Sequence, residues 1–225
     1  MMRMKATMLG VLVQWIRNTM AASMLEALRE TEERFRDSVE SSANPTQRVG
    51  NVDVFDGIAV CNIIEMNRHS IIEGAKRTAF PVPFPRQATA TIALAAEHIN
   101  SGNGIVVHEL AGLNETCNIR FVPEFLDTAG SAPVIVKELT DVLNRQTFRP
   151  CAFIGAFLSS ISLPTSILTG VAGFPQITAT STSPDLDDKS RFPLFGRAIP
   201  TASKYGLPLL QFLYNEWNVR HLGIL

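Results

Sequence analysis

Short apolar runs alternate with helix-like segments from residue 52 onward, and this alternation limits the fold more than any other feature of the sequence. We expect strands at 57–65, 118–127, 150–157, 174–180 and 219–225. We expect helices at 86–104, 131–146, 159–172 and 204–218, and the prolines within 81–85 predict a loop there. Strands separated by helices of this length pair in parallel, so the sequence predicts an α/β fold in which a parallel sheet is flanked by helices.

Residues 1–51 lack this pattern and are expected to form a separate N-terminal segment, with the folded domain over 52–225. Basic residues precede an apolar stretch at 6–16, which fits a short signal peptide or anchor and fits an amphipathic helix equally well. A charged helix is expected at 22–42 and a linker at 43–53. Because the expected last strand ends with the sequence, we expect the domain to be incomplete and the chain to be a fragment of a longer protein.

The composition excludes some classes of protein. The 225 residues, 46% of them hydrophobic, can bury a sizeable core. The formal net charge of −1 offers no basic stripe to neutralise phosphates, so no nucleic-acid partner is expected.

Cysteine usage leaves two possibilities open. The three cysteines, Cys61, Cys117 and Cys151, form no CxxC pair, so zinc is not indicated. One disulfide with a free thiol and three buried thiols fit the sequence equally well. The one sequon, Asn114-Glu115-Thr116, would accept a glycan only in the secretory pathway.

Motifs of enzyme active sites are missing. The sequence contains no dinucleotide fingerprint after a strand, no P-loop, no GxSxG and no HExxH, and its four histidines are isolated. Asp185, Asp187 and Asp188 have a calcium-like spacing, but the glycine and the final glutamate of an EF-hand are absent, which favours a solvated turn. We therefore expect a non-enzymatic protein without a cofactor or bound metal.

Two clusters of hydroxyl side chains follow neighbouring predicted strands. Ser159 and Ser160 come after the strand at 150–157 and open the next helix, and Thr180, Ser181 and Thr182 come after the following strand. In open parallel sheets, ligands bind outside the carboxyl ends of the strands, where free N–H groups at helix N-termini favour anions. The clusters therefore predict either a cradle for a carboxylate or, alternatively, a helix cap and a series of Ser and Asp turns.

The stretch that contains both clusters, GAFLSSISLPTSILTGVAGFPQITATSTSPDLDDKSRFPLFGRAIP at 155–200, resembles the ligand-binding region of class C receptors. These include the metabotropic glutamate and GABA type B receptors, and the receptor guanylyl cyclases are relatives. TIALAAEHINSGNGI resembles the first helix of that region, and FVPEFLDTAGSAPVIVKEL resembles its second strand and helix. The resemblance covers about residues 86–225 and is most specific over 155–200.

The resemblance implies a venus-flytrap domain of the periplasmic-binding-protein-like type I, in which two α/β lobes close over a ligand. The chain would hold most of the first lobe, with 198–203 near the crossing and the last helix and strand opening the second lobe. The serine that binds the ligand carboxylate falls on Ser159, aided by the backbone amide of Ser160. The contacts of the Ser/Thr turn fall on Thr180 and Thr182.

Two departures from the family pattern matter for the ligand. Glutamate-type receptors continue with an acid that faces the ligand ammonium, whereas this chain reads Pro200-Thr201-Ala202. Ala129 stands where many members have a cysteine, so the disulfide of that cysteine is not expected here. These departures favour a carboxylate-bearing or other small polar ligand over an α-amino acid.

We therefore expect an extracellular ligand-binding module of a membrane receptor of GABA type B or glutamate-like character, which signals through lobe closure and works as a receptor dimer. Two alternatives remain: a soluble solute-binding protein of the periplasmic type, and the sensor domain of a receptor guanylyl cyclase.

Overall fold

A computed structural model describes residues 47–55, 57–67, 83–146 and 148–223. The apolar stretch at 6–16 and the charged helix expected at 22–42 lie outside these residues. The strands are β1 Gln47–Val49, β2 Val52–Phe55, β3 Ile58–Asn67, β4 Ile119–Asp127, β5 Pro150–Gly155, β6 Gln176–Thr178 and β7 Phe195–Arg197. The α-helices are α2 Pro83–Ser101, α3 Leu113–Thr116, α4 Ala132–Leu143, α5 Ser159–Val171 and α6 Gly206–Asn215. Short 3₁₀ turns lie at His108–Leu110, Pro184–Asp187 and Ala202–Lys204.

Five strands form a parallel sheet in the spatial order β4-β3-β5-β6-β7. Numbered along the chain from β3, this is the order 2-1-3-4-5 of a doubly wound α/β sheet. β1 and β2 add an antiparallel hairpin beside the amino-terminal half of β3. The strand order reverses between β3 and β5, and ligands of such sheets bind at the carboxyl ends of the strands near this point.

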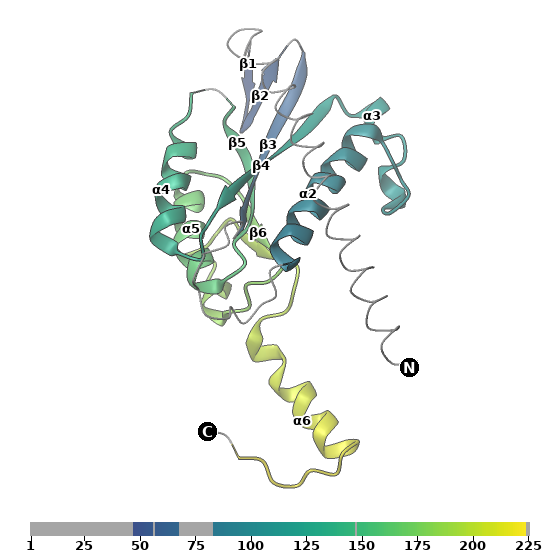
Figure 1. The fold of residues 1–225 in the computed structure, drawn as a ribbon, viewed down its shortest axis with the longest axis vertical. Helices are drawn as coiled ribbons and strands as arrows, with labels where there is room; N and C mark the ends of the chain where they lie inside the picture. The colour runs from purple at the N-terminus through teal and green to yellow at the C-terminus, as the bar shows by residue number, and fades with distance from the viewer. Residues whose placement is uncertain (1–46, 56, 68–82, 147, 224–225) are drawn as a thin grey trace, which may run out of the picture.

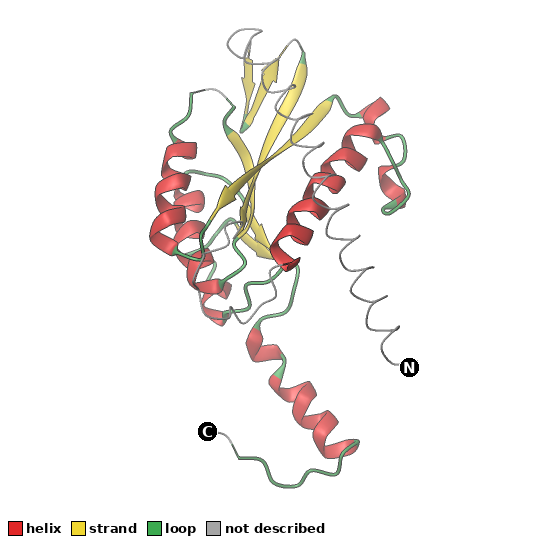
Figure 2. Cartoon of the chain, viewed as in Figure 1, coloured by secondary structure: helices red, strands yellow, loops and turns green. Residues whose placement is uncertain are grey.

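Helices cover both faces of the sheet, as Figure 2 shows: α2 lies on one face and α4 and α5 lie on the other. The buried residues of α4, Ile135, Leu139 and Val142, recur every three or four positions and so share one side of the helix. They belong to the main core cluster, which also contains Ile64 of β3 and Phe153 of β5. This arrangement confirms the predicted α/β fold of an incomplete periplasmic-binding-protein-like lobe.

Three parts of the sequence-based prediction were wrong. The prolines of 81–85 do not exclude a helix, because α2 begins at Pro83, and the first turn of a helix needs no N–H donors. The run expected as a strand at 219–225 has no strand in its described part, 219–223, where no described strand pairs with it. In addition, residues 47–49 of the expected linker form β1.

Pro123, which lacks an N–H donor, lies in β4, a strand that pairs with β3 alone among the described strands. An edge strand tolerates proline because only one of its sides must supply ladder hydrogen bonds.

A disulfide joins Cys61 of β3 to Cys151 of β5 across the sheet. The register of the two strands passes from Asn62 opposite Pro150 to Ile63 opposite Ala152, so Cys151 is the extra residue of a one-residue shift. Both half-cystines are buried, and Cys117 is a free thiol. Of the two possibilities that the sequence left open, the structure therefore has the single disulfide.

Candidate functional site

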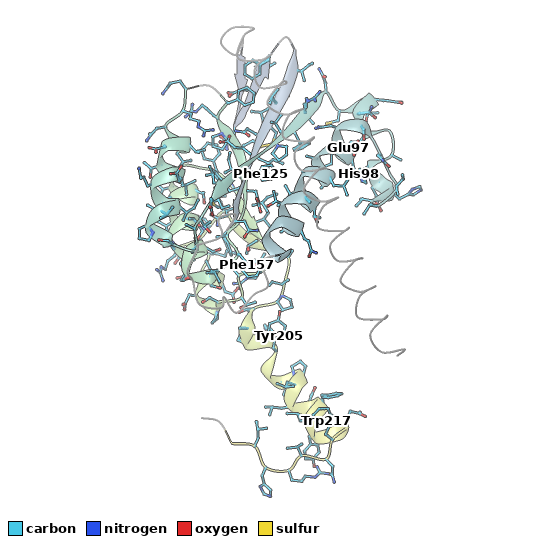
Figure 3. The ribbon with its side chains drawn as sticks, in the orientation of Figure 1. Glu97, His98, Phe125, Phe157, Tyr205 and Trp217 are labelled. Carbon is cyan, nitrogen blue, oxygen red and sulfur yellow. A yellow bond between two sulfur atoms is a disulfide. The ribbon has the colours of Figure 1, made fainter. Side chains whose placement is uncertain are left out.

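The two hydroxyl-bearing segments follow adjacent parallel strands at one edge of the sheet. β5 and β6 pair through Phe153 with Gln176 and through Ile154 with Ile177. After each of these strands, the polypeptide leaves the sheet at the strand's carboxyl end. Residues 156–158 lead from β5 into α5, and residues 179–183 form the Ser/Thr turn after β6. Figure 3 shows Phe157 at this end of the sheet.

Two hydrogen bonds between the segments involve predicted site residues. The Ser183 N–H donates to Ser159 Oγ at 3.1 Å, and the Thr180 hydroxyl donates to the Phe157 carbonyl at 3.0 Å. Both bonds join residues more than twenty positions apart in the sequence. The structure thus brings together Ser159 and the turn that contains Thr180 and Thr182, whereas their role in ligand binding stays a prediction.

The helix-cap alternative for Ser159 is wrong. The N-cap of α5 is Leu158, whose side chain makes no capping bond, and Ser159 is the first residue of the helix. The Leu158 carbonyl accepts the N–H groups of Ile161 and Ser162. In the described part of the chain, the N–H groups of Ser159 and Ser160 have no acceptor, as expected for the first turn of a helix.

The four predicted residues differ in how much of their hydrogen-bonding capacity is already used. Ser159 Oγ accepts one bond and keeps its own proton to donate, and Thr180 has donated its proton to the backbone. The side chain of Ser160 is exposed, and that of Thr182 is half-buried. Within the described residues, neither of these last two hydroxyls has a hydrogen bond.

A layer of buried hydroxyls beneath the site holds its two sides together. Ser162 of α5 and Ser181 of the turn share a hydrogen bond of 2.7 Å, and both are fully buried. The Ala156 carbonyl accepts from Thr178 at 2.9 Å and lies 3.1 and 2.9 Å from the hydroxyls of Ser162 and Ser181. One of these two serines donates to the other, and the second donates to the carbonyl. Sequence reasoning missed this layer, although the spacing of Ser162, Thr165 and Thr169 on one side of a predicted helix could have indicated it.

Gln176 of β6 extends the layer along α5. Its side-chain amide donates to the Gly155 carbonyl and to Thr165, and its side-chain oxygen accepts from Thr169. A buried polar group is costly unless it is hydrogen-bonded, and this one has partners for both its nitrogen and its oxygen.

Arg197 of β7 fixes the outer side of the Ser/Thr turn. Its guanidinium donates to the carbonyls of Ser181 and Ser183 at 3.2 and 3.0 Å, and it pairs with Asp187 at 2.6 Å. The backbone carbonyl of Thr182 accepts from the Ala202 N–H at 2.8 Å. The backbone of the turn is therefore held on both sides.

Thr201 lies where glutamate-type receptors would continue with serine before the acid. It is buried, and its hydroxyl donates to the Thr182 carbonyl at 3.3 Å. This segment therefore supports the turn through the backbone and carries no acid at the next residue, Ala202.

The aspartates after the turn serve local structure. Asp187 pairs with Arg197, Asp185 accepts from the Ser183 hydroxyl, and Asp188 accepts from the hydroxyl and N–H of Ser190. The bonds from Ser190 lower the pKa of Asp188 below its ordinary value. Among the described residues, no group of three or more His, Cys, Asp or Glu side chains could hold a metal ion.

Sequence reasoning also missed a buried acid close to the carboxyl end of β3. Glu65 is 2% exposed, and its carboxylate accepts from the hydroxyl of Thr89 on α2. It lies opposite Ile154 of β5, at the point where the strand order reverses.

The described helices include none that is long and apolar enough to cross a membrane. The comparison with curated proteins gives no match. A family model described as the receptor family ligand binding region matches residues 88–225, which include β4 to β7, both hydroxyl-bearing segments and α6. The chain therefore belongs to the receptor family that this ligand-binding region defines.

Proposed function

We propose that the chain is the extracellular ligand-binding module of a class C-like membrane receptor and binds a small carboxylate or other polar ligand. Ser159 and Thr182 would donate hydroxyl hydrogen bonds to the carboxylate, and the N–H groups that open α5 would add two more donors. Thr180 would support the turn, because its hydroxyl donates to the Phe157 carbonyl and its N–H donates to the Thr178 hydroxyl, so neither is left to donate to the carboxylate. The observation that carries this proposal is the 3.1 Å bond between Ser183 N–H and Ser159 Oγ, which joins the two segments at one edge of the sheet.

Hydrogen bonds to a charged group are stronger than neutral ones, and the positive end of a helix adds to the attraction for an anion. A site with hydroxyl and N–H donors from two strand ends therefore fits a carboxylate. Lobe closure would follow because contacts from a second lobe add binding energy only in the closed state.

The surface of α6 supports the presence of a second lobe that packs against it. Leu207, Leu209, Phe212 and Tyr214 of α6 are exposed in the described structure, and Figure 1 shows this helix extending away from the sheet. Large apolar side chains exposed together on one helix indicate an interaction surface. We assign α6 to the start of the second lobe, as the position of 198–203 at the crossing implies.

The buried disulfide supports a location outside the cell, because disulfides persist in oxidising compartments. Membrane attachment, signalling and a receptor dimer belong to this proposal as well. A soluble solute-binding protein and the sensor of a receptor guanylyl cyclase would share the lobe and its carboxylate site, and they differ from the proposal in what the ligand-binding module is attached to. We propose no enzymatic activity.

Calorimetric titration of the full chain tests the ligand class. The probes are 4-aminobutyrate, L-glutamate and acetate, with 4-aminobutyramide as the counterpart of the first, in which a neutral amide replaces the carboxylate and the ammonium group stays. We expect a carboxylate to bind and its amide to bind at least about tenfold more weakly, because a hydrogen bond to a charged group contributes about 1.5–3 kcal/mol. Equal binding of acid and amide, or no binding of any carboxylate, would contradict the proposal.

A further inference from the structure

We propose that Asn114 carries an N-linked glycan, so that the end of the lobe opposite the ligand site is a glycosylated surface. The inference rests on the proposed extracellular role, because the transfer takes place in the secretory pathway. Asn114-Glu115-Thr116 satisfies the acceptor pattern, whereas Asn44-Pro45-Thr46 has a proline at the middle position and does not.

The folded chain presents the acceptor at its surface. Asn114, Glu115 and Thr116 are all exposed and form most of the four-residue helix α3. The Asn114 side chain packs over Gly102, where a β-carbon would meet its amide oxygen at 2.0 Å, and Gly102 has a φ of +66°. Glycine at this position therefore leaves room for the asparagine while the residue stays open to solvent.

The location of α3 leaves the ligand site clear. Asn100, near the end of α2, exchanges two hydrogen bonds of 2.8 Å with the backbone of Phe121, close to the amino end of β4. α3 therefore lies by the amino ends of the parallel strands, whereas Ser159 follows a carboxyl end. Figures 1 and 3 show α3 and Phe157 at opposite ends of the sheet.

The loop before α3 gives a glycan something to cover. Ile105, Val106 and Val107 are 85%, 71% and 45% exposed, three consecutive apolar residues in solvent. The loop closes on itself through a 3.0 Å bond from Gly112 N–H to the Gly102 carbonyl, which is the glycine under the Asn114 side chain. Exposed apolar runs promote association, and a hydrated oligosaccharide beside the loop would oppose it.

The chemistry uses one co-reactant, an oligosaccharide carried on a lipid diphosphate. The Asn114 side-chain nitrogen forms a bond to the first carbon of the sugar, and the bond from that carbon to the phosphate oxygen breaks. The lipid diphosphate leaves with the electron pair, and the amide nitrogen gives up one proton.

The experiment translates the full chain, with a second acceptor sequon appended after Leu225, in the presence of endoplasmic reticulum microsomes. Peptide mapping before and after N-glycosidase treatment locates each glycan. We expect glycans on both the appended sequon and Asn114. Asn114→Gln and Thr116→Ala should each remove only the glycan at residue 114. Thr116→Ser and the matched control Glu115→Gln should keep that glycan.

The appended sequon separates failure of this inference from failure of the proposed function. A glycan on the appended sequon with none on Asn114 would overturn the inference and leave the extracellular role standing. The absence of a glycan from both the appended sequon and Asn114 would contradict entry into the secretory pathway. That result would overturn both the proposed extracellular location and the glycan at Asn114.

Discussion

Ser162 Oγ and Ser181 Oγ lie 2.7 Å apart with no solvent exposure, and this pair connects helix α5 to the turn after β6. Both oxygens also lie within hydrogen-bond distance of the Ala156 carbonyl, at 3.1 and 2.9 Å, and the hydroxyl that does not donate to its partner serine donates to this carbonyl. The two surface segments that contain Ser159 and Thr182 therefore rest on one shared buried contact.

Replacing both serines of this pair should cost less stability than the sum of the two single replacements. Ser162→Ala or Ser181→Ala leaves the other hydroxyl buried with one partner fewer, and we expect each to lower the free energy of unfolding by about 1–3 kcal/mol. The double variant should lose less free energy of unfolding than the two single variants together, because it leaves neither serine hydroxyl without its partner serine. Chemical denaturation of the four proteins measures the coupling, and strictly additive losses would show that the pair does not act as a unit.

Gly155 should not tolerate alanine. It has a φ of +111°, and a β-carbon would lie 2.2 Å from the Met66 carbonyl oxygen of the neighbouring strand. A residue held in a sparsely populated backbone region costs about 1–3 kcal/mol, and the collision with backbone adds to this. Thermal unfolding of Gly155→Ala should show a clear loss of stability.

The matched control is Gly206→Ala at the start of α6. Apart from the adjacent residues and the helix's own backbone, no atom lies within 4 Å of the β-carbon that this substitution adds, so its stability should stay near that of the parent chain. Equal effects of the two substitutions would contradict the close approach of β5 to β3.

Reduction should destabilise the fold through Cys61–Cys151 alone. The disulfide closes a sequence separation of 90 residues, and removing a native disulfide typically costs about 2–5 kcal/mol. Cys61→Ser with Cys151→Ser should therefore unfold at lower denaturant concentration and lose its sensitivity to reductant. Cys117→Ser, which changes the free thiol, should keep both the stability and that sensitivity. A Cys117→Ser variant that behaved like the double variant would show a different pairing.

Arg197→Lys should loosen the Ser/Thr turn. Lysine has the charge but lacks the planar group that reaches two carbonyls and a carboxylate at once. Because Asp187 is largely exposed, we assign most of the effect to the carbonyls of Ser181 and Ser183 and expect a loss of about 1–3 kcal/mol. Hydrogen exchange should speed up over residues 181–187.

Arg191→Lys is the control for this prediction, because Arg191 is exposed and stacks on the Phe192 ring, a contact that lysine can keep. An unchanged rate of hydrogen exchange over residues 181–187 in Arg197→Lys would contradict the conclusion that Arg197 holds the Ser/Thr turn.

The sequence predicted the fold well because its signals were local. Helix α4 follows from apolar residues at helical spacing after Ser131, and β5 follows from the apolar run at 150–157, of which the strand uses Pro150–Gly155. The start of α2 at Pro83 was missed because proline was read as a helix breaker without regard to its place in the first turn. Strand formation at 219–223 depends on a partner strand, which a local pattern cannot report.

The site was predictable in its location and less so in its bonding. Ser159 and Thr182 could be placed at adjacent strand ends from the order of strands and helices alone. That Ser159 accepts the Ser183 N–H, and that Arg197 and Ser162 hold the turn, depends on contacts between residues 14 to 24 positions apart or on tertiary packing. Such partners are brought together only by the folded turn, so a local sequence pattern does not reveal them.

The central claim is that Ser159 and Thr182 hold the same ligand group, and a double-mutant cycle in ligand binding tests it most directly. Thr182→Val removes a hydroxyl that has no hydrogen bond within the described residues, so the fold should be nearly unaffected. Thr140→Val, on the exposed side of α4, is the matched control. The affinity for the best-binding carboxylate is then measured by calorimetry for Ser159→Ala, Thr182→Val and the pair.

We expect each single substitution to weaken the affinity about tenfold or more and the control to leave it unchanged. The double variant should lose affinity by a smaller factor than the product of the two single factors. Unchanged affinity in Thr182→Val, or losses that multiply fully, would contradict a carboxylate shared between the two segments.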